Sequence, residues 1–444
     1  MERLQNDTPR ARFAWISADS GSFSDASALF RRAGYAIAEP PVEGVIDVAL
    51  VDVRSSRLTV KGAQKLAEAA RSRAPECGIV FIGGANLTSA ERAHLRRFGD
   101  LVIAETDLSP VIDICRYRLR IRSIAEETGE RLKSVAASTR LSEFPPIETS
   151  SKAPSVLIAS APGPLALAAI SAAEGVAANC GAALTAGQAL RALETGLFDV
   201  AVFLPKAEGD PLISLARSLR RHHRFQDLPV IMAAPDEGPR LKLATANAAE
   251  AMLPQHLVED LPARLLAVSR RARLVGAMRR FLAACAGDGV RDRFSGAFTP
   301  QFFAQHAERI FARADQTGRP TALVCIRLAP AAPEDGDITA GRTLTEAARL
   351  INRVCRAEDF VGRLTRDTFI VLMSGAVAAD ATFAARRIEG VIANTMFRTR
   401  GERNLYAVAA ASAAIERTSG SRLDETIAAA LARLNGVEPR TAER

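Results

Sequence analysis

The chain of 444 residues is longer than one compact domain needs, and at roughly 100–200 residues per domain its length predicts two to four domains. Hydrophobic residues make up 48% and charged residues 24%, which is ordinary for a soluble globular protein. Of the 58 basic residues only six are lysine, and the formal net charge is +8. An arginine excess suits planar recognition of phosphates and nucleobase edges, but a GC-rich coding bias explains most of it, since alanine is also abundant.

Other bulk features exclude several classes. The longest apolar stretches, such as residues 164–173, are too short for a membrane span, and the first residues lack the apolar core of a signal peptide. We therefore expect a cytoplasmic protein without membrane insertion. The six cysteines are scattered singly and the five histidines show no ligand spacing, so we expect neither a disulfide framework nor a zinc site. The arginines are spread along the chain, which favours a solvated surface over a nucleic-acid-binding arm.

The first third of the chain alternates short runs rich in Val and Ile with helix-like segments, the pattern of a doubly wound parallel sheet. Strands are predicted over residues 13–16, 45–53, 78–82 and 101–103. A long amphipathic helix is predicted over residues 109–139, and a linker rich in Pro and Ser follows it.

The second third repeats this arrangement. Strands are predicted over residues 155–159, 199–204, 229–233 and 251–253. Asp47-Val-Ala-Leu-Val and Asp199-Val-Ala-Val-Phe look like the same element twice, so the sequence indicates an internal domain duplication. A helical connector is predicted over residues 265–284.

The last third has a different order of elements, which predicts an α+β sheet. After a first helix, strands are predicted over residues 322–328, 360–364, 369–373 and 406–411, and helices over residues 343–356 and 379–392. Four residues, Thr365-Arg-Asp-Thr368, separate the second strand from the third and read as a hairpin turn.

These motifs carry a resemblance to known families. The first two units resemble receiver domains of response regulators, and the third resembles the GGDEF domain of diguanylate cyclases. The GGDEF signature R-L-G-G-D-E-F has its counterpart in Arg363-Leu-Thr-Arg-Asp-Thr-Phe369, and Asp292-Arg-Phe-Ser-Gly-Ala-Phe-Thr299 replaces the opening motif D-x-L-T-G-L-x-N-R. The order of domains is similar to that of PleD-type response regulators. The resemblance implies two flavodoxin-like receiver domains with doubly wound parallel sheets, followed by an α+β, nucleotidyl-cyclase-like GGDEF domain.

The resemblance also suggests domain borders. We expect a receiver-like domain with an extended last helix at residues 1–140, a linker at 141–154 and a degenerate receiver domain at 155–270. A helical connector at 271–290 would lead to a degenerate GGDEF domain at 291–444.

The expected catalytic residues of a cyclase are mostly replaced. Such enzymes need carboxylates to hold two magnesium ions, but Arg327 stands at the acidic position of the first strand. Two glycines that would let backbone amides approach phosphate are Thr365 and Arg366, and the last acid of the signature is Thr368. Asp367 survives at the metal-binding position of the signature, but we interpret it as an ordinary turn aspartate. No Asn or Asp suited to the GTP base is visible over residues 329–336. We therefore expect neither metal binding nor cyclase activity.

An Arg-x-x-Asp motif does survive. In the family, this motif forms a product-binding site five residues before the signature, and Arg356-Ala-Glu-Asp359 has that spacing. Arg356 could pair with guanine O6 and N7, and Asp359 could accept from guanine N1–H and the amino group. The bare pattern also occurs at Arg97 and Arg224, so its position carries the argument. The alternative is that Arg356 caps a helix and Asp359 closes a turn.

A second arginine often completes such a site from the following helix. Arg387 lies in the matching region, with Arg386 as its neighbour, and an ordinary solvated helix arginine is the alternative.

The receiver resemblance makes Asp52 the phosphoacceptor-like residue. Its expected partners are depleted, because Asp19 is the one remnant of the acidic pair, Gly83 or Gly84 stands near the Thr/Ser position, and Glu105 stands near the Lys position. In the second receiver, Leu204 replaces the aspartate and Pro254 or a neighbour replaces the lysine. That domain is expected to serve only in dimerisation or docking.

Together these features predict a non-catalytic cyclic di-GMP effector that forms a homodimer through its receiver domains. The resemblance implies partners in cell-cycle-regulated proteolysis at the cell pole: a protease adaptor and a cell-cycle regulator such as CtrA, delivered to the ClpXP protease. An active diguanylate cyclase and a ligand-independent phosphorelay scaffold switched at Asp52 are the alternatives. A nucleic-acid partner is not expected.

Overall fold

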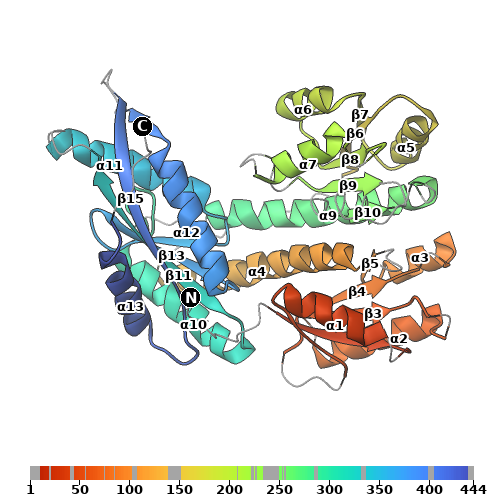
Figure 1. Ribbon diagram of the computed structural model, residues 1–444, viewed down its shortest axis with the longest axis horizontal. Helices are drawn as coiled ribbons and strands as arrows, with labels where there is room; N and C mark the ends of the chain where they lie inside the picture. The colour runs from red at the N-terminus through yellow and green to blue at the C-terminus, as the bar shows by residue number, and fades with distance from the viewer. Residues whose placement is uncertain are drawn as a thin grey trace. The chain divides into compact units, whose positions relative to one another are not determined.

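The computed structural model contains three five-stranded sheets surrounded by helices (Figure 1). Residues in Ala11–Ile121 and Glu148–Ala277 form one compact unit, the double-sheet unit, and residues in Arg122–Ile147 and Met278–Arg444 form a second, the C-terminal unit. The structure describes residues 11–19, 22–40, 45–55, 57–74, 76–84, 86–102, 108–138, 152–207, 209–221, 225, 228–233, 250–252, 254, 257–284, 289–331, 337–398 and 405–438.

The first sheet is parallel with strand order β2-β1-β3-β4-β5, the flavodoxin-like order 2-1-3-4-5. Its strands are Arg12–Ser17, Ala36–Ala38, Val48–Asp52, Gly78–Ile82 and Asp100–Val102 for β1 to β5. Helices cover both faces because strand residues alternate between two buried clusters. One cluster includes α1 (Ser22–Arg32) and α4 (Ser109–Ser138), and the other includes α2 (Val60–Arg73) and α3 (Ser89–Leu95).

The second sheet has the same topology, with order β10-β9-β8-β6-β7. Its strands are Ser155–Ser160, Asn179–Ala183, Val200–Leu204, Val230–Ala233 and Glu250–Met252 for β6 to β10. Its helices are α5 (Pro164–Glu174), α6 (Ala186–Thr195), α7 (Pro211–Arg221) and α9 (Leu257–Ala284). The doubly wound parallel sheets expected from the sequence are therefore present in both halves.

One repeated hydrogen bond shows that the two sheets are built alike. Oδ2 of Asp47 accepts from the backbone N–H of Arg12, 2.8 Å away, at the start of β1. Oδ2 of Asp199 accepts from the backbone N–H of Ser155, 2.9 Å away, at the start of β6. The two aspartates of the repeated sequence element thus serve the same structural purpose, which supports an internal duplication.

Within the double-sheet unit, buried ion pairs join elements of the two sheets. Asp260 of α9 is 1% exposed and accepts from Arg92 of α3 at 3.3 Å and from Arg96, the residue after α3, at 3.1 Å. Asp100 of β5 accepts from Arg271 of α9 at 2.6 Å. Burial opposes ionisation of Asp100 and Asp260, but the neighbouring guanidinium groups keep the pKa of each below its usual value.

The third sheet is antiparallel, with order β12-β13-β11-β15-β14. Its strands are Thr321–Pro330, Phe360–Arg363, Thr368–Ser374, Met396–Arg398 and Leu405–Glu416 for β11 to β15. The helices α11 (Asp337–Val354) and α12 (Ala378–Ala393) pack on one face through a large hydrophobic cluster. The helices α10 (Pro300–Thr317) and α13 (Leu423–Asn435) contact the sheet from its other side.

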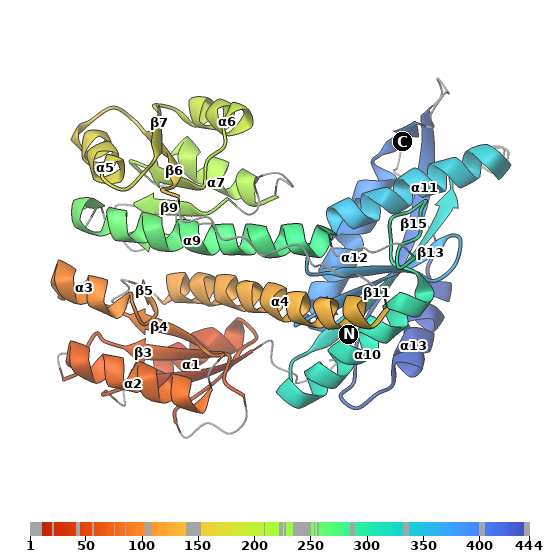
Figure 2. The same cartoon turned by 180° about the vertical axis from the view of Figure 1, so that it is seen from behind.

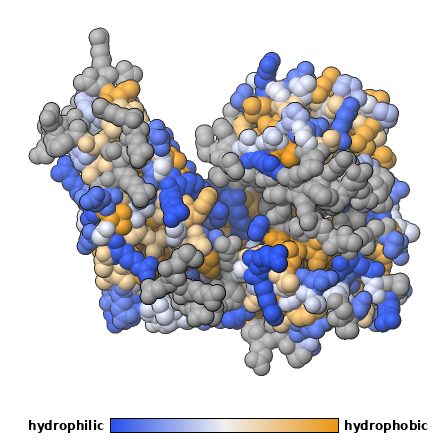
Figure 3. Space-filling view, viewed as in Figure 1, coloured by the Kyte–Doolittle hydropathy of each residue, from blue (hydrophilic) through white to orange (hydrophobic). Residues whose placement is uncertain are grey.

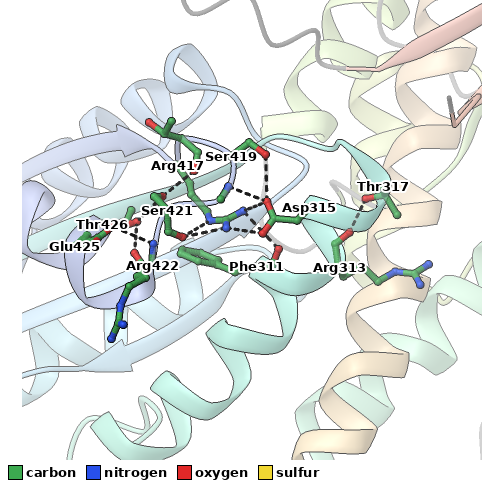
Figure 4. Close-up of polar contacts among 12 residues, drawn as sticks. Phe311, Arg313, Asp315, Thr317, Arg417, Ser419, Ser421, Arg422, Glu425 and Thr426 are labelled. Atoms are coloured by element: carbon green, nitrogen blue, oxygen red, sulfur yellow. Dashed lines mark hydrogen bonds and ion pairs between the residues drawn. The ribbon is translucent and has the colours of Figure 1, made fainter. Parts of the chain in front are cut away.

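A polar clamp ties α10 to the loop before α13 (Figure 4). Arg417 donates from Nη1 and Nη2 to the two carboxylate oxygens of Asp315, at 2.8 and 2.7 Å. Its guanidinium lies 4.3 Å from the ring centre of Phe311 and also donates to the carbonyl of Ser421. The backbone N–H of Gly420 completes the clamp by donating to Asp315.

The structure adds features that the sequence pattern did not predict. The short edge strands β2, β7 and β14 were missed, and the predicted connector helix belongs to one helix, α9, that starts at Leu257. Both α4 and α9 are continuous (Figure 2), and each contributes residues to both compact units. The domain borders proposed from the sequence therefore stay predictions, and residues 141–151 of the expected linker lie outside the described residues.

On the face drawn in Figure 3, hydrophilic and apolar residues are interspersed over both units. Among the described helices, none is both long and apolar enough to cross a membrane.

Candidate functional site

The Arg-x-x-Asp motif forms a tight turn directly after α11. The backbone N–H of Arg356 donates to Oδ2 of Asp359 at 2.8 Å, and the N–H of Asp359 donates to the carbonyl of Arg356 at 3.1 Å. Asp359 thus closes the turn, as its structural alternative predicted. Arg356 itself is exposed to solvent.

The electrostatic surroundings of Asp359 are unusual for a carboxylate near the surface. Removal from water and the neighbouring Glu358 raise the pKa of Asp359 to about 6, although Arg356 and Arg387 act in the opposite direction. Its carboxylate is therefore close to its protonation midpoint at mildly acidic pH, and an added hydrogen-bond donor would stabilise the ionised form.

Arg387 comes to the same corner from α12. Its Nη2 donates to the carbonyl of Val354, the last residue of α11, at 3.1 Å. Within the described part of the chain, Nε of Arg387 is buried and has no hydrogen-bond partner. The structure therefore brings together Arg356, Asp359 and Arg387, the three residues proposed from the sequence.

The hairpin between β12 and β13 carries the remaining carboxylate of the signature. Oδ1 of Asp367 accepts from the hydroxyl groups of Thr365 and Thr368, at 2.7 and 3.0 Å. Partial burial opposes ionisation, but these hydroxyl groups and the more distant Arg327 keep the pKa of Asp367 below its usual value. The residues that replaced a glycine and an acid are thus the partners of Asp367.

Arg327 occupies the strand position beside this hairpin. It pairs with Thr368 across β11 and β13, and its guanidinium donates to Oδ1 of Asn435 at 3.1 Å. It also reaches the carbonyls of Leu434 and Val437 at the end of α13, at 3.4 Å. A cation therefore stands where a cyclase would need a second carboxylate, and the charge of the helix end stabilises it.

The donor set at this hairpin does not fit a pair of magnesium ions. Magnesium requires several hard oxygen ligands in octahedral geometry, and here one hydroxyl-bonded carboxylate lies near a guanidinium. Over the described residues, no group of three or more His, Cys, Asp or Glu side chains could hold a metal. Residues 332–336, in the loop expected to read the GTP base, lie outside the described residues.

Arg363 connects the hairpin to the opening motif through hydrogen bonds. Its Nη1 donates to Asp292 at 2.8 Å, while Nε and Nη2 donate to the carbonyls of Thr365 and Arg366, both at 2.9 Å. Asp292 also accepts from the backbone N–H of Ser295 at 2.8 Å, and these contacts outweigh burial and lower its pKa. This structural role of Arg363 was not predicted, although Arg363 is the first residue of the signature.

In the double-sheet unit, Asp52 ends β3 and is 2% exposed. Arg54 donates to both of its oxygens, from Nε to Oδ1 at 2.9 Å and from Nη2 to Oδ2 at 2.7 Å. These bonds overcome the effect of burial and lower the pKa of Asp52. Gly83 provides the space, because a Cβ there would lie 2.4 Å from Cγ of Arg54. The pairing of Asp52 with Arg54 was not predicted from the sequence.

The structure also shows where several of the other positions expected from the receiver resemblance lie. Asp19 lies in the exposed loop after β1, and Glu105 lies outside the described residues. In the second sheet, Leu204 is paired with Ser160 as Asp52 is paired with Ser17, so a buried apolar residue occupies the equivalent place. Pro254 is half-buried after β10.

The comparisons with known proteins bear on the antiparallel sheet and its turn. Residues 291–441 match the family model described as "Diguanylate cyclase, GGDEF domain". These residues form a GGDEF domain. No curated protein matches the sequence significantly.

Solved structures similar to the chain include several GGDEF proteins. The diguanylate cyclase SiaD of Pseudomonas aeruginosa, solved with its activator SiaC, is 20% identical over 36% of this chain, with a TM-score of 0.31. The chain spans 62% of SiaD, less than two thirds of its length. The GGDEF domain of DgcB from Caulobacter crescentus, solved with c-di-GMP, is 18% identical over 34% of this chain and 90% of its own, with a TM-score of 0.31.

A sensory box/GGDEF family protein from Caulobacter crescentus CB15 is 24% identical over 33% of this chain and 97% of its own, with a TM-score of 0.30.

Proposed function

We propose that the protein is a non-catalytic, PopA-like effector that binds cyclic di-GMP at the Arg356–Asp359 turn. The observation that carries this proposal is the meeting of Arg356, Asp359 and Arg387 at one corner of the GGDEF domain. The guanidinium of Arg356 can donate to guanine O6 and N7 or stack on the purine face. The Asp359 carboxylate can accept from guanine N1–H and the amino group.

The proposed absence of catalysis rests on the other end of the domain. Arg327, Thr365 and Arg366 replace groups that would hold metal and phosphate, and the side chains of Arg327 and Thr365 form hydrogen bonds of their own there. Restoring a metal site would require several of these contacts to be broken at once. The domain is therefore suited to recognising the nucleotide product and unsuited to making it.

The double-sheet unit is proposed to contain two receiver domains. The shared order 2-1-3-4-5 and the aspartate at the end of β3 support this assignment. In the proposed function, these domains mediate homodimerisation and the docking of partners: a protease adaptor and a cell-cycle regulator such as CtrA, delivered to the ClpXP protease at the cell pole.

Calorimetric titration with cyclic di-GMP tests the proposal. The full chain should bind, and Arg356→Gly should bind about tenfold to a hundredfold more weakly, as expected for loss of one bidentate guanine contact. The matched control is Arg353→Ala, which removes another exposed arginine one turn earlier. Alanine is used there because Arg353 lies inside α11, where glycine would weaken the helix. No heat with the wild type, or equal binding by Arg356→Gly, would refute the site.

A further inference from the structure

The C-terminal half of α4 carries a buried polar network that belongs to the C-terminal unit. Glu127, Arg131 and Ser134 of this helix are 2%, 3% and 0% exposed, and His306 of α10 is 0% exposed. Buried charged groups are costly unless they are paired and hydrogen-bonded, so these four side chains must satisfy one another.

The network is closed by direct contacts. Nε of Arg131 donates to Oε1 of Glu127 at 2.8 Å, and Nε2 of His306 lies 3.0 Å from the same oxygen. Nδ1 of His306 lies 2.9 Å from Oγ of Ser134. Burial raises the pKa of Glu127, but His306 and Arg131 outweigh it and leave the pKa lowered. The network thus fastens α4 to α10 with an ionised pair at its centre.

Arg131 continues from this network to the Arg-x-x-Asp turn. Its Nη2 donates to the carbonyl of Ala357, which lies between Arg356 and Asp359, at 3.4 Å. Its guanidinium carbon also lies 5.1 Å from the ring centre of Phe360, the residue after Asp359. The Arg131 side chain therefore contacts both the backbone of the turn and the ring of Phe360, which directly follows the turn.

Phe360 is enclosed by the same groups. Its ring is fully buried, stacks on Phe298 with centres 4.2 Å apart, and lies 4.2 Å from the ring of His306. Gly362 lets α10 approach this strand, because a Cβ there would lie 2.4 Å from the ring of Phe303. A displacement of Arg131 or His306 would therefore loosen the residue next to Asp359.

We propose that Arg131 is a positioning residue for the Arg-x-x-Asp turn, so that ligand occupancy of the turn and docking of the C-terminal half of α4 are linked. The ligand part of this inference rests on the proposed function. Because coupling free energies are reciprocal, a ligand that stabilises the turn also stabilises the docking of α4, and loss of the contact with α4 lowers the affinity for the ligand. A ligand at the turn would thus change the stability of α4, a helix that also contributes residues to the double-sheet unit.

Hydrogen exchange of the full chain tests the link without ligand. The variant is Arg131→Met with Glu127→Gln, which removes both buried charges together, and the control is Lys133→Met, which removes an exposed cation of the same helix. Amides of residues 356–361 should exchange about tenfold or more faster in the double variant, and Arg131→Lys should lie between it and the wild type. Unchanged exchange, or equal acceleration of β13, would overturn the positioning role.

Adding cyclic di-GMP separates this inference from the proposed function. The ligand should slow exchange of residues 123–137 in the wild type, and the double variant should bind about tenfold more weakly than the Lys133→Met control. If the wild type does not bind, the proposed function fails, while exchange in the ligand-free turn still decides the role of Arg131. If the wild type binds but neither α4 exchange nor the affinity of the variant changes, the link is refuted.

Discussion

Arg54 grips the Asp52 carboxylate with two parallel hydrogen bonds at the end of the central strand of the first sheet. A third bond comes from the backbone N–H of Arg54 at 3.1 Å. A buried carboxylate held in this way is already neutralised by a cation of its own chain. An incoming phosphoryl group would have to displace the guanidinium from the oxygen to which it becomes bonded.

This pairing predicts that the wild-type protein does not become phosphorylated at Asp52. Incubation with acetyl phosphate and Mg²⁺, followed by intact-mass spectrometry, should show no added phosphate. Arg54→Ala should free the carboxylate and allow slow labelling, whereas the control Arg57→Ala, which removes a neighbouring arginine, should stay unlabelled. Stoichiometric labelling of the wild type that disappears in Asp52→Asn would contradict the prediction.

The raised pKa of Asp359 predicts a pH dependence for cyclic di-GMP binding. The carboxylate must be ionised to accept from guanine N1–H, and its pKa of about 6 in the free protein means that protonation competes with the ligand below that pH. Affinity should therefore fall as pH decreases, by about tenfold between pH 7 and pH 5, because the ionised fraction falls by about that factor. Calorimetry at several pH values checks this.

Asp359→Asn supplies the control for that titration. Its binding should be weaker than that of the wild type at pH 7 and nearly independent of pH over the same interval. Affinity of the wild type that stays constant from pH 7 to pH 5 would show that Asp359 does not contact the base.

The contrast between Asp359 and Arg131 shows what the sequence could predict. Asp359 belongs to a local motif at a fixed distance from a recognisable signature, so its place in a turn follows from nearby residues alone. Arg131 reaches Ala357 across 226 positions of the chain, and Arg363 reaches Asp292 across 71. Such contacts depend on how helices pack, which hydrophobic periodicity does not encode.

Two of the three missed edge strands were too short to be recognised. Strand β2 has three residues and β14 also has three, too few for an alternating pattern to stand out. Central strands such as β3 and β8 are buried on both faces and read as continuous apolar runs, so their positions were predicted well.

The residues at the β12–β13 hairpin predict that the protein does not convert GTP to cyclic di-GMP in the presence of Mg²⁺. Arg327→Asp alone should not restore turnover, because Thr365 and Arg366 still replace the glycines. The same change should lower the free energy of unfolding by about 1 kcal/mol, since it removes the cation that caps the end of α13. Product chromatography and urea denaturation check the two parts, and any turnover by the wild type would overturn the proposed function.

The clamp between Asp315 and Arg417 predicts a stability change with a defined pH window (Figure 4). Mainly through Arg417, the pKa of Asp315 falls from its ordinary 3.8 to about 2. Because the folded pKa is the lower one, the stabilisation is complete above about pH 4 and is lost as pH falls towards 2. Asp315→Asn should lower the free energy of unfolding by about 1 kcal/mol at neutral pH, a modest value because the Asp315 side chain is 38% exposed.

Urea denaturation between pH 3 and pH 7 measures this effect, with Asp424→Asn as the matched control. Asp424, in the first turn of α13, pairs with Arg422 just before that helix, but both side chains are largely exposed, so solvent screens their attraction. The difference between wild type and Asp315→Asn should stay constant from pH 7 to pH 5 and shrink below pH 4, while Asp424→Asn stays close to wild type throughout. A difference that grew on acidification would show that the clamp stabilises the protonated form and would reverse its assigned role.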